Sequence, residues 1–319
     1  MSLLKLRLSI LATLALVIGA SSLFFAIILS ILGTFNIASW IFLVLVFNIL
    51  QWLLAPYIID AIYGVRELKK SEMPSLHSRL EMLCKKLNLK TPKLMLANIP
   101  IPNAFAYGSP ITGNRVAVTS GLLKELNEDE VEAVIGHELG HLKHRDVQLM
   151  MFVSVLPAIF YYLAYSMMFS SRYSEREQEE RASLAALIGI ISMVAYWILS
   201  LLVLHLSRLR EYYADRRSAM IVNDGARKLS VALAKIVSST SRLQRHYGNL
   251  RGFNSFKTLF IEDPDRAEID EIELRKARIS EMEMVEKIVS RKLTWVDRLL
   301  ELFSSHPNIV KRLRALQQI

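Results

Sequence analysis

The most constraining feature of the sequence is a run of 52 residues, positions 8 to 59, without a single charged side chain. As a helix this run would be about 78 Å long, more than twice the ~30 Å apolar thickness of a bilayer, so it accommodates two spans. Two further uncharged runs, 147–171 and 182–207, are each about one span long. The sequence therefore predicts four transmembrane helices, at about 8–32, 38–59, 149–170 and 184–207.

Two other interpretations of these runs have to be weighed. Lys5 and Arg7 resemble the basic region of a cleaved signal peptide, but the apolar run is far longer than the ~7–15 residues of a signal core. The last two runs could also be buried helices of a soluble protein. Composition favours the membrane, because 52% of the residues are hydrophobic and 22% are charged, whereas soluble domains average about 45–50% and about 25%.

The distribution of basic residues predicts the orientation in the membrane. With four spans, the basic flanks of the polar segments all lie on one side: Lys5, Arg7, Arg66, Lys69, Lys70, Lys143, Arg145, Arg208, Arg210, Arg216 and Arg217. The segment between the third and fourth spans carries three arginines, but four glutamates accompany them. We therefore expect a multi-pass protein of the cell membrane with both termini and most of the polar chain in the cytoplasm.

The net charge of +9 agrees with a lipid bilayer as partner, because basic residues near anionic headgroups are favoured. Nucleic acid is the competing explanation. The basic residues flank the apolar runs or alternate with acidic ones, as in 266–291, so we expect no nucleic-acid partner, and no nucleotide cofactor is indicated either. A single cysteine, Cys84, excludes a disulfide scaffold.

The polar segments predict a mostly helical domain with a small sheet. Residues 72–90 have leucines at helical spacing, and short β-favourable runs follow at 93–98, 103–108 and 115–120. Asn127 with Glu130 is a capping-box pattern that opens a helix, and nothing in the sequence breaks this helix before the third span. Further helices are expected at 226–238, 266–291 and 293–303, and 242–260 is expected to be a surface connector, a segment on the membrane or a cover over a cleft.

The strongest chemical signal is His137-Glu138-Leu139-Gly140-His141, an H-E-x-x-H pattern on this helix. Residues four apart lie on one helix face, so the two imidazoles can converge on one Zn²⁺. Glu138 lies beside them and can receive the proton of a water whose acidity the metal raises. His144 is too far along the helix, at about 10.5 Å of rise from His137, to bind the same ion, and Val147 stands where a metzincin needs its third histidine.

Membrane topology narrows the choice of a third ligand. The glutamates at 175–180 lie across one span and therefore on the wrong side of the bilayer, whereas Glu211 lies across two spans and returns to the side of His141. Asp215 shares a helix face with Glu211 and can accept the free N–H of a zinc-binding imidazole. The alternative for Glu211 is an interfacial salt bridge with Arg208 or Arg210.

Several ordered motifs together resemble one family. They are HELGHxxxxD from His137, the helix segment Arg210-Glu211-Tyr212-Tyr213-Ala214-Asp215, the segment Asn103-Ala104-Phe105-Ala106, and Ser305-His306-Pro307 followed by Arg312. With apolar spans between them, they look like the HtpX family of integral-membrane zinc endopeptidases, relatives of the CAAX prenyl protease. The match covers most of the chain from residue 90 onward.

This resemblance implies a gluzincin-type zinc peptidase domain facing the cytoplasm, with one Zn²⁺ per chain. It implies that His137, His141 and Glu211 are the ligands, that Glu138 is the general base, and that the enzyme cuts damaged or misfolded membrane proteins, often under heat or envelope stress. The expected partners are thus polypeptides, above all membrane proteins.

The resemblance also suggests roles for two further segments, and alternatives stay open for both. Asn103, Ala104, Phe105 and Ala106 would be an edge strand to which substrate adds as a β-strand, or else an ordinary strand of the sheet. His306 would donate a hydrogen bond to the developing oxyanion, or else simply precede a helix that starts at Pro307. Arg312 is expected to stabilise the fold.

The whole sequence thus predicts a membrane α+β protein with four segments. Residues 1–60 form a transmembrane hairpin, 61–148 the first part of the peptidase domain, 149–207 a second hairpin, and 208–319 the second part of the domain. The predicted function is zinc-dependent hydrolysis of peptide bonds. The alternatives are a CAAX-type prenyl-protein endopeptidase and a membrane scaffold without catalysis, which would have no need of Glu138.

Overall fold

The computed structural model describes residues 37–170, 179–247 and 280–319. The predicted span 8–32 and the first part of the predicted helix 266–291 lie outside these residues. The chain divides into two compact units. We call the described residues up to Gln51 and within Gln148–Leu206 the apolar unit, and those within Trp52–Val147 and Ser207–Ile319 the polar unit.

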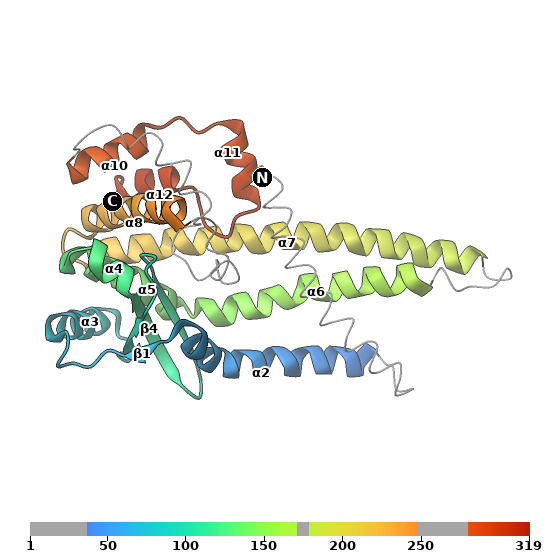
Figure 1. Ribbon diagram of the computed structural model, residues 1–319. Coiled ribbons are helices and arrows are strands. Elements are labelled where there is room, and N and C mark those ends of the chain that lie inside the picture. Colours follow the sequence, from blue (N-terminus) through green and yellow to red (C-terminus); the bar gives the residue numbers. More distant parts are fainter. Residues whose placement is uncertain (1–36, 171–178, 248–279) are drawn as a thin grey trace. The chain divides into compact units, whose positions relative to one another are not determined.

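Three long helices supply the apolar unit: α2 (Ile37–Tyr63), α6 (Asp146–Ser170) and α7 (Glu179–Ile221) (Figure 1). Within this unit α6 and α7 approach closely at Gly189, where an added Cβ would lie 3.2 Å from the carbonyl oxygen of Ala164. The rings of Tyr161 and Tyr196 meet edge to face, with centroids 5.2 Å apart. Small residues at a close helix contact are typical of helices that pack in lipid.

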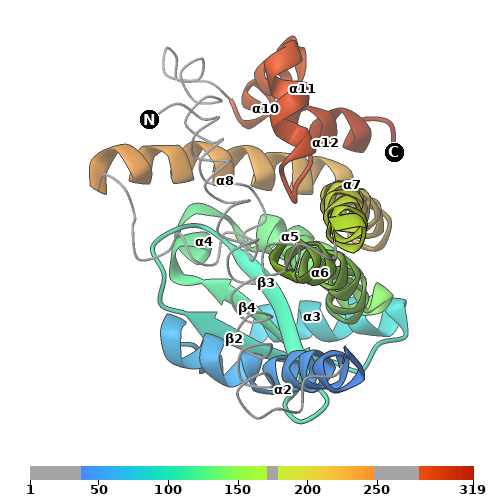
Figure 2. The ribbon, with the colours of Figure 1, turned by 90° about the vertical axis from the view of Figure 1, so that its right-hand side faces the viewer.

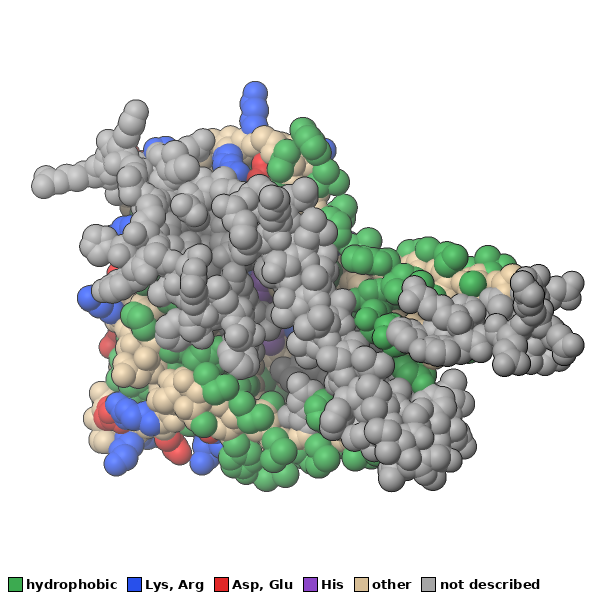
Figure 3. Space-filling model, turned by 45° about the vertical axis from the view of Figure 1, so that its right-hand side comes forward, with side chains coloured by type: hydrophobic (Ala, Val, Ile, Leu, Met, Phe, Trp, Pro, Cys, Tyr) green, Lys and Arg blue, Asp and Glu red, His purple; other side chains and the backbone are tan. Residues whose placement is uncertain are grey.

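Among the described residues, one helical segment, Ala186–Ile221, is long and apolar enough to cross a membrane, and Trp52–Tyr63 and Ile159–Met168 are shorter apolar helices. Hydrophobic side chains cover much of the surface of these helices (Figure 3). Ile190, Ile191 and Leu202, for example, are each more than half exposed. Four transmembrane helices are therefore not established by the described residues.

The polar unit contains a four-stranded mixed sheet in the order β1-β2-β4-β3. The strands are β1 (Arg66–Glu67), β2 (Lys93–Ala97), β3 (Ala104–Ser109) and β4 (Gly113–Thr119). β2 and β4 are parallel, and β1 and β3 pair antiparallel on the two outer sides. The three longer strands coincide with the three β-favourable runs of the sequence, and β3 is an edge strand.

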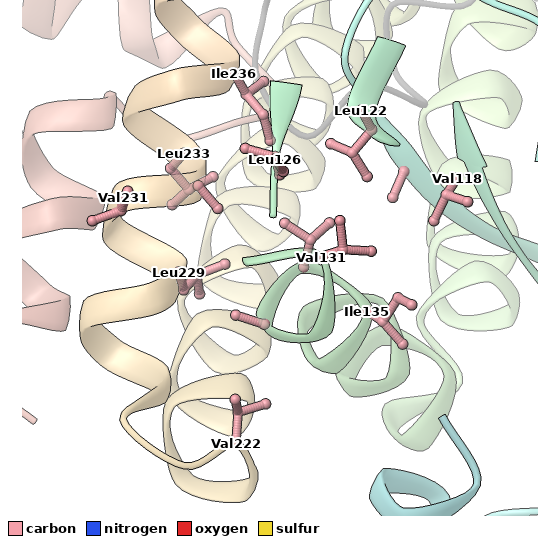
Figure 4. Packing of buried hydrophobic residues seen from close by; sticks show 14 of the residues in the cluster. Val118, Leu122, Leu126, Val131, Ile135, Val222, Leu229, Val231, Leu233 and Ile236 are labelled. Carbon is pink, nitrogen blue, oxygen red and sulfur yellow. The ribbon is translucent and has the colours of Figure 1, made fainter. Parts of the chain in front are cut away.

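Helix α5 (Glu128–His144) is the centre of the polar unit. It packs against α3 (Pro74–Leu87), α8 (Gly225–Tyr247) and strands β3 and β4 (Figure 2). Figure 4 shows the core between α8, α5 and the end of the sheet, to which α4 (Ser120–Glu125) also contributes. The labelled side chains are Val118, Leu122, Leu126, Val131, Ile135, Val222, Leu229, Val231, Leu233 and Ile236. The capping box expected at Asn127 is present, with Glu130 as its partner.

The other face of the sheet packs against the last turns of α2. Ile59 and Tyr63 join a second hydrophobic cluster with Phe105 and Tyr107 of β3. The hydroxyl of Tyr107 donates to Asp60 at 2.7 Å, and Arg115 of β4 forms an ion pair with the same carboxylate. The end of α2 is thereby fixed to the sheet.

The prediction of an unbroken helix from α5 into the third span is wrong. α5 ends at His144, Arg145 adopts a left-handed conformation with φ of 55°, and α6 begins at Asp146. A left-handed residue other than glycine costs on the order of 1–3 kcal/mol and persists only where surrounding contacts fix it. Here the break lets Asp146 turn back toward His141, five residues earlier, which a straight helix would prevent.

The last elements are α8, α10 (Glu281–Ser290), α11 (Trp295–Leu302) and α12 (Ile309–Leu316). α11 matches its prediction to within two residues. α8 runs to Tyr247, so the first part of the predicted connector 242–260 is helix, and its remainder lies outside the described residues. α12 packs against α10 and α8 and brings Arg312 into the interior.

Candidate metal centre

Three side chains of the polar unit converge on one point. They are His137 and His141 of α5 and Glu211 of α7, and their ligand atoms all lie within 4.8 Å of one another. The two histidine Nε2 atoms are 3.1 Å apart. Oxygens of the Glu211 carboxylate lie 3.6 Å from Nε2 of His137 and 3.4 Å from Nε2 of His141. His137 and Glu211 are buried, and His141 is nearly so.

A close approach of α5 and α7 makes this convergence possible. A Cβ added to Gly140 would lie 3.0 Å from Cα of Ala214, and one added to Gly136 would lie 2.9 Å from Oγ of Ser218. The Ser218 hydroxyl also donates to the carbonyl of Ala133 at 2.6 Å. Two glycines one turn apart therefore let the backbone of α7 pass close enough for Glu211 to reach both imidazoles.

Asp215 and Arg312 support the first histidine. Oδ1 of Asp215 lies 2.8 Å from Nδ1 of His137, the nitrogen that faces away from the cluster. Arg312 is fully buried and donates to both carboxylate oxygens of Asp215, at 2.8 and 2.7 Å. A carboxylate on the distal nitrogen fixes the tautomer of a ligating histidine and turns its Nε2 toward the metal.

Asp146 and Arg210 support the second histidine in the same way. Oδ2 of Asp146 lies 2.7 Å from Nδ1 of His141 and 3.1 Å from Nε of Arg210. Arg210 therefore pairs with Asp146, and Arg208 donates to backbone carbonyls. The alternative for Glu211, a salt bridge with Arg208 or Arg210, finds no support in this geometry.

The pKa shifts reflect the mutual dependence of these groups. Burial disfavours the charged form of His141, but Asp146 and Glu211 outweigh it and raise its pKa to about 10. Burial likewise disfavours the carboxylate of Glu211, yet His306 and the two imidazoles hold its pKa well below the usual range. For Glu138 burial dominates and raises the pKa.

This donor set fits a zinc ion. Two imidazole nitrogens and one carboxylate, with room for a fourth ligand, are the pattern of catalytic zinc sites. Oε2 of Glu211 has no hydrogen-bond partner among the described residues, although it is buried. When both imidazoles are neutral, as metal ligation requires, the buried carboxyl groups around the cluster outnumber the arginines that face them, and a divalent cation would balance the charge: Glu138, Asp146, Glu211 and Asp215 against Arg210 and Arg312.

Glu138 lies beside the ligands and touches strand β3. Its Oε2 accepts a hydrogen bond from the backbone N–H of Ala106 at 2.7 Å. The Thr119 N–H donates to the carbonyl of Asn103. The backbone groups of Asn103 and of every second residue after it therefore form the hydrogen bonds to β4. The backbone groups of Ala104 and Ala106 therefore point to the free edge of the sheet, on the side of Glu138.

The side chains of this segment are used for packing. Asn103 is buried, and its backbone N–H donates to Oγ1 of Thr119. Phe105 packs between Tyr63 and Tyr107, while Ala104 joins the main core. Of the four residues 103–106, only main-chain groups remain available at the edge.

His306 is brought to the cluster by the loop between α11 and α12. Its Nδ1 lies 3.4 Å from Oε2 of Glu211, and neither ring nitrogen has a hydrogen-bond partner among the described residues. Arg208 fixes this loop, since its Nη1 donates to the carbonyls of Glu301 and Ser304, each at 2.8 Å. His144, in contrast, is exposed at the end of α5 and lies apart from the ligands.

Sequence reasoning missed Asp146, Arg210 and Gly140 as parts of this centre. Asp146 is the aspartate of HELGHxxxxD, but its contact with His141 depends on the break at Arg145, where no glycine or proline marks the chain. Gly140 lies inside the H-E-x-x-H pattern, and only its approach to Ala214 reveals why the position is small.

Comparison with known proteins agrees with this geometry. Residues 70–319, most of the chain, match the profile of Peptidase family M48. The chain belongs to peptidase family M48. It is therefore a metallopeptidase, and polypeptides are its substrates.

Curated relatives within M48 are proteases of the HtpX type. A Protease HtpX homolog of Thermoplasma acidophilum is 36% identical and covers 86% of this chain, which in turn covers 83% of that protein. Protease HtpX homolog 2 of Saccharolobus solfataricus is 37% identical over 99% of this chain and 97% of its own length. A Protease HtpX homolog of Archaeoglobus fulgidus is 36% identical, over 97% of this chain and 85% of its own.

The crystal structure of S. mikatae Ste24p has a similar fold, with a TM-score of 0.56 at 16% identity. It covers 98% of this chain, which spans 66% of the Ste24p chain. M48 peptidases are in general zinc-dependent, as the donor set of the cluster suggests. The resemblance inferred from the motifs is thereby confirmed.

Proposed function

We propose that this M48 peptidase is an integral-membrane zinc endopeptidase that cuts misfolded or damaged membrane proteins, including under heat or envelope stress. The observation that carries the proposal is the convergence of His137, His141 and Glu211 beside Glu138, which itself touches the free edge of β3. A scaffold without catalysis would not need a buried carboxylate at that place, because its burial is unfavourable.

In the proposed mechanism His137, His141 and Glu211 would hold one Zn²⁺. Bound zinc supplies a Lewis acid that polarises the scissile carbonyl and makes water more acidic. Glu138 takes the proton of the attacking water on its carboxylate and passes it to the leaving amine. Burial prepares Glu138 for this task by raising its pKa, which makes it a better proton acceptor.

Substrate would bind as an extra strand along β3. Main-chain groups of Ala104 and Ala106 would pair with the substrate backbone, which gives affinity with little demand on sequence. Such tolerance suits an enzyme that meets many unfolded substrates. His306 would donate a hydrogen bond to the oxyanion from a ring nitrogen, a role supported by the absence of another partner for it among the described residues.

For the membrane part we propose four spans, in hairpins at 1–60 and 149–207, with the peptidase domain formed by 61–148 and 208–319 in the cytoplasm. The uncharged runs, the basic flanks and the apolar segment Ala186–Ile221 support this topology. Asp215 completes the centre as the partner of His137.

The decisive experiment compares cleavage of an unfolded test protein by the wild type and by Glu138→Gln, each with its bound zinc measured. We expect the variant to keep zinc and to lose activity by about 10²–10⁴-fold, the usual contribution of a general base. Glu132→Gln is a matched control, because Glu132 is also buried on α5 but pairs with Arg79 away from the ligands.

Equal activity of the wild type and Glu138→Gln would contradict the proposed mechanism. Loss of activity in both Glu132→Gln and Glu138→Gln would point to a general defect of α5. A prenylated C-terminal peptide is run in parallel, and cleavage of that peptide in preference to the unfolded protein would favour the CAAX-type alternative.

A further inference from the structure

Helix α11 turns both of its acidic residues inward and most of its apolar residues outward. Asp297 and Glu301 are buried, whereas Trp295 is 72% exposed. At 100° per residue, the exposed hydrophobic side chains form one continuous stripe that faces away from the buried residues of the helix. The members of this stripe, which we call the α11 stripe, are Trp295, Val296, Leu299 and Leu302.

Polar contacts prevent the helix from rolling over to bury the stripe. Asp297 caps the helix through Thr294 and accepts from Arg291 at 3.0 Å. At the other end Glu301 accepts from the backbone N–H of Asn308 and pairs with Lys311. The outward direction of the stripe is therefore built into the fold.

The charges around the stripe are basic. Arg298 lies beside one edge of the stripe and is exposed, and Lys292 is exposed just before the helix. Both acidic residues of α11 are turned inward and paired. An apolar stripe with tryptophan and exposed cations is complementary to the surface of an anionic bilayer, and less so to a partner protein of ordinary mixed charge.

The attachment of α11 to α7 also favours a bilayer as the partner of the α11 stripe. Arg208 is the first charged residue after the uncharged run 182–207 of α7. Its guanidinium binds the carbonyls of Glu301, Leu302 and Ser304, at the C-terminal end of α11. α11 is thus tied to α7 at the point where the apolar run ends, which is the level of the headgroups if that run spans a membrane.

We propose that α11 is an interfacial helix, with the α11 stripe inserted into the surface of an anionic bilayer. This inference rests on the proposed membrane location. Figure 3 shows hydrophobic side chains on the surface where α11 lies. Because the loop that follows α11 carries His306, the lipid surface would hold one wall of the metal centre in place.

The test uses the full chain in nanodiscs of phosphatidylcholine with phosphatidylglycerol, with nitroxide labels at introduced cysteines. Leu299→Cys reports on the stripe, Met82→Cys on exposed α3 is the water control, and Ile191→Cys is the lipid control. Cys84 is buried with its pKa raised to about 11, so the unmodified chain should take up no label.

We expect the label at position 299 to collide with oxygen more often than with a water-soluble nickel complex, as at 191 and opposite to 82. Removing phosphatidylglycerol, or replacing Arg298 by Glu, should shift the 299 label toward the value in water. A 299 label that behaves like the one at 82 overturns the proposal. So does protection from both reagents, which would mean that another chain segment or a second copy covers the stripe.

The control at Ile191 separates the two levels of the argument. If the label at position 191 also collides more often with the nickel complex than with oxygen, the membrane location is refuted and the inference is refuted with it. If the label at 191 collides more often with oxygen while the label at 299 collides more often with the nickel complex, the membrane location stands and only the interfacial role of α11 is refuted.

Discussion

Each histidine of the candidate metal centre is paired with one aspartate. Asp215 faces His137 and Asp146 faces His141, both on the nitrogen that points away from the cluster. Each aspartate in turn faces an arginine, Arg312 or Arg210. The two halves of the centre are therefore built alike, although Asp146 follows His141 closely in the sequence and Asp215 lies far from His137.

Asp146→Asn should weaken zinc binding by about 10–100-fold, the usual effect of losing such a carboxylate, because an amide holds the imidazole less firmly and leaves Arg210 unpaired. Competition with a chromogenic chelator measures the affinity. Asp129→Asn, at a half-exposed position at the start of α5, should bind zinc as the wild type does. Unchanged affinity in Asp146→Asn would show that the Asp146 carboxylate is not needed to orient His141.

At the residue scale, the sequence predicts those side chains of the candidate site whose spacing along the chain indicates their chemistry. His137, Glu138 and His141 follow from one helix turn, and Glu211 was inferred from the side of the membrane on which it would emerge. Asp146 could not be assigned a role, since its position depends on a backbone break at Arg145 that has no local signal.

At the scale of elements, the crossing of α5 and α7 determines whether the ligands meet. Gly140→Ala should improve the intrinsic helix propensity of α5 by up to about 1 kcal/mol, yet the added methyl lies only 3.0 Å from Cα of Ala214. Backbone cannot yield as a flexible side chain does. We expect a net destabilisation of about 1–3 kcal/mol, as for other overpacked contacts, together with weaker zinc binding.

Thermal unfolding and a zinc titration of Gly140→Ala test this expectation. Gly64→Ala offers a comparison in which nothing lies within 4 Å of the added carbon, although its positive φ adds local strain. Gly140→Ala with full zinc affinity would mean that the two helices can separate without moving the ligands.

The contact between α3 and α5 should make stability depend on pH. The hydrogen bond from Arg79, followed in size of effect by the one from Lys228, lowers the pKa of Asp129. A carboxyl group whose pKa is lower in the folded state stabilises the protein above its unfolded pKa, and this contribution is lost as the pH falls through the folded pKa. Because Asp129 is about half exposed, we expect no more than about 1 kcal/mol. Asp129→Asn should therefore lose less stability than the wild type between pH 7 and pH 3, measured by thermal unfolding in detergent.

Elements were predicted well where hydrophobic periodicity is clean and less well where polar residues are buried. The three longer strands and α11 lie where the patterns indicated. α8 continues beyond the Ser-Ser-Thr-Ser run at 238–241, because Ser239 is buried and its hydroxyl binds Glu125 of α4. The mixed order of the sheet could not be read from the sequence, since nothing local determines which strands pair.

For the whole molecule, zinc should stabilise the polar unit and leave the apolar unit unaffected. At a zinc concentration about 100 times Kd, binding contributes about 2.7 kcal/mol. For a domain of roughly 150–250 residues, removal by a chelator should then lower Tm by about 5–10 °C. Glu211→Ala should show little dependence on the chelator. An equal Tm with and without chelator in the wild type would contradict a metal centre in the folded protein.

The order of the chain has a consequence for the time at which this enzyme matures. Arg312 follows Asp215 by 97 residues, and His306 lies in the same late segment. At the usual speed of synthesis of about 5–20 residues per second, this distance corresponds to about 5–20 s. During that interval the nascent chain already contains His137, His141, Glu211 and Asp215, but Arg312, which neutralises Asp215, has not yet been made. A newly made copy should thus stay inactive until its distal segment has folded back onto α7, so a peptidase still under synthesis should not cut the polypeptides around it.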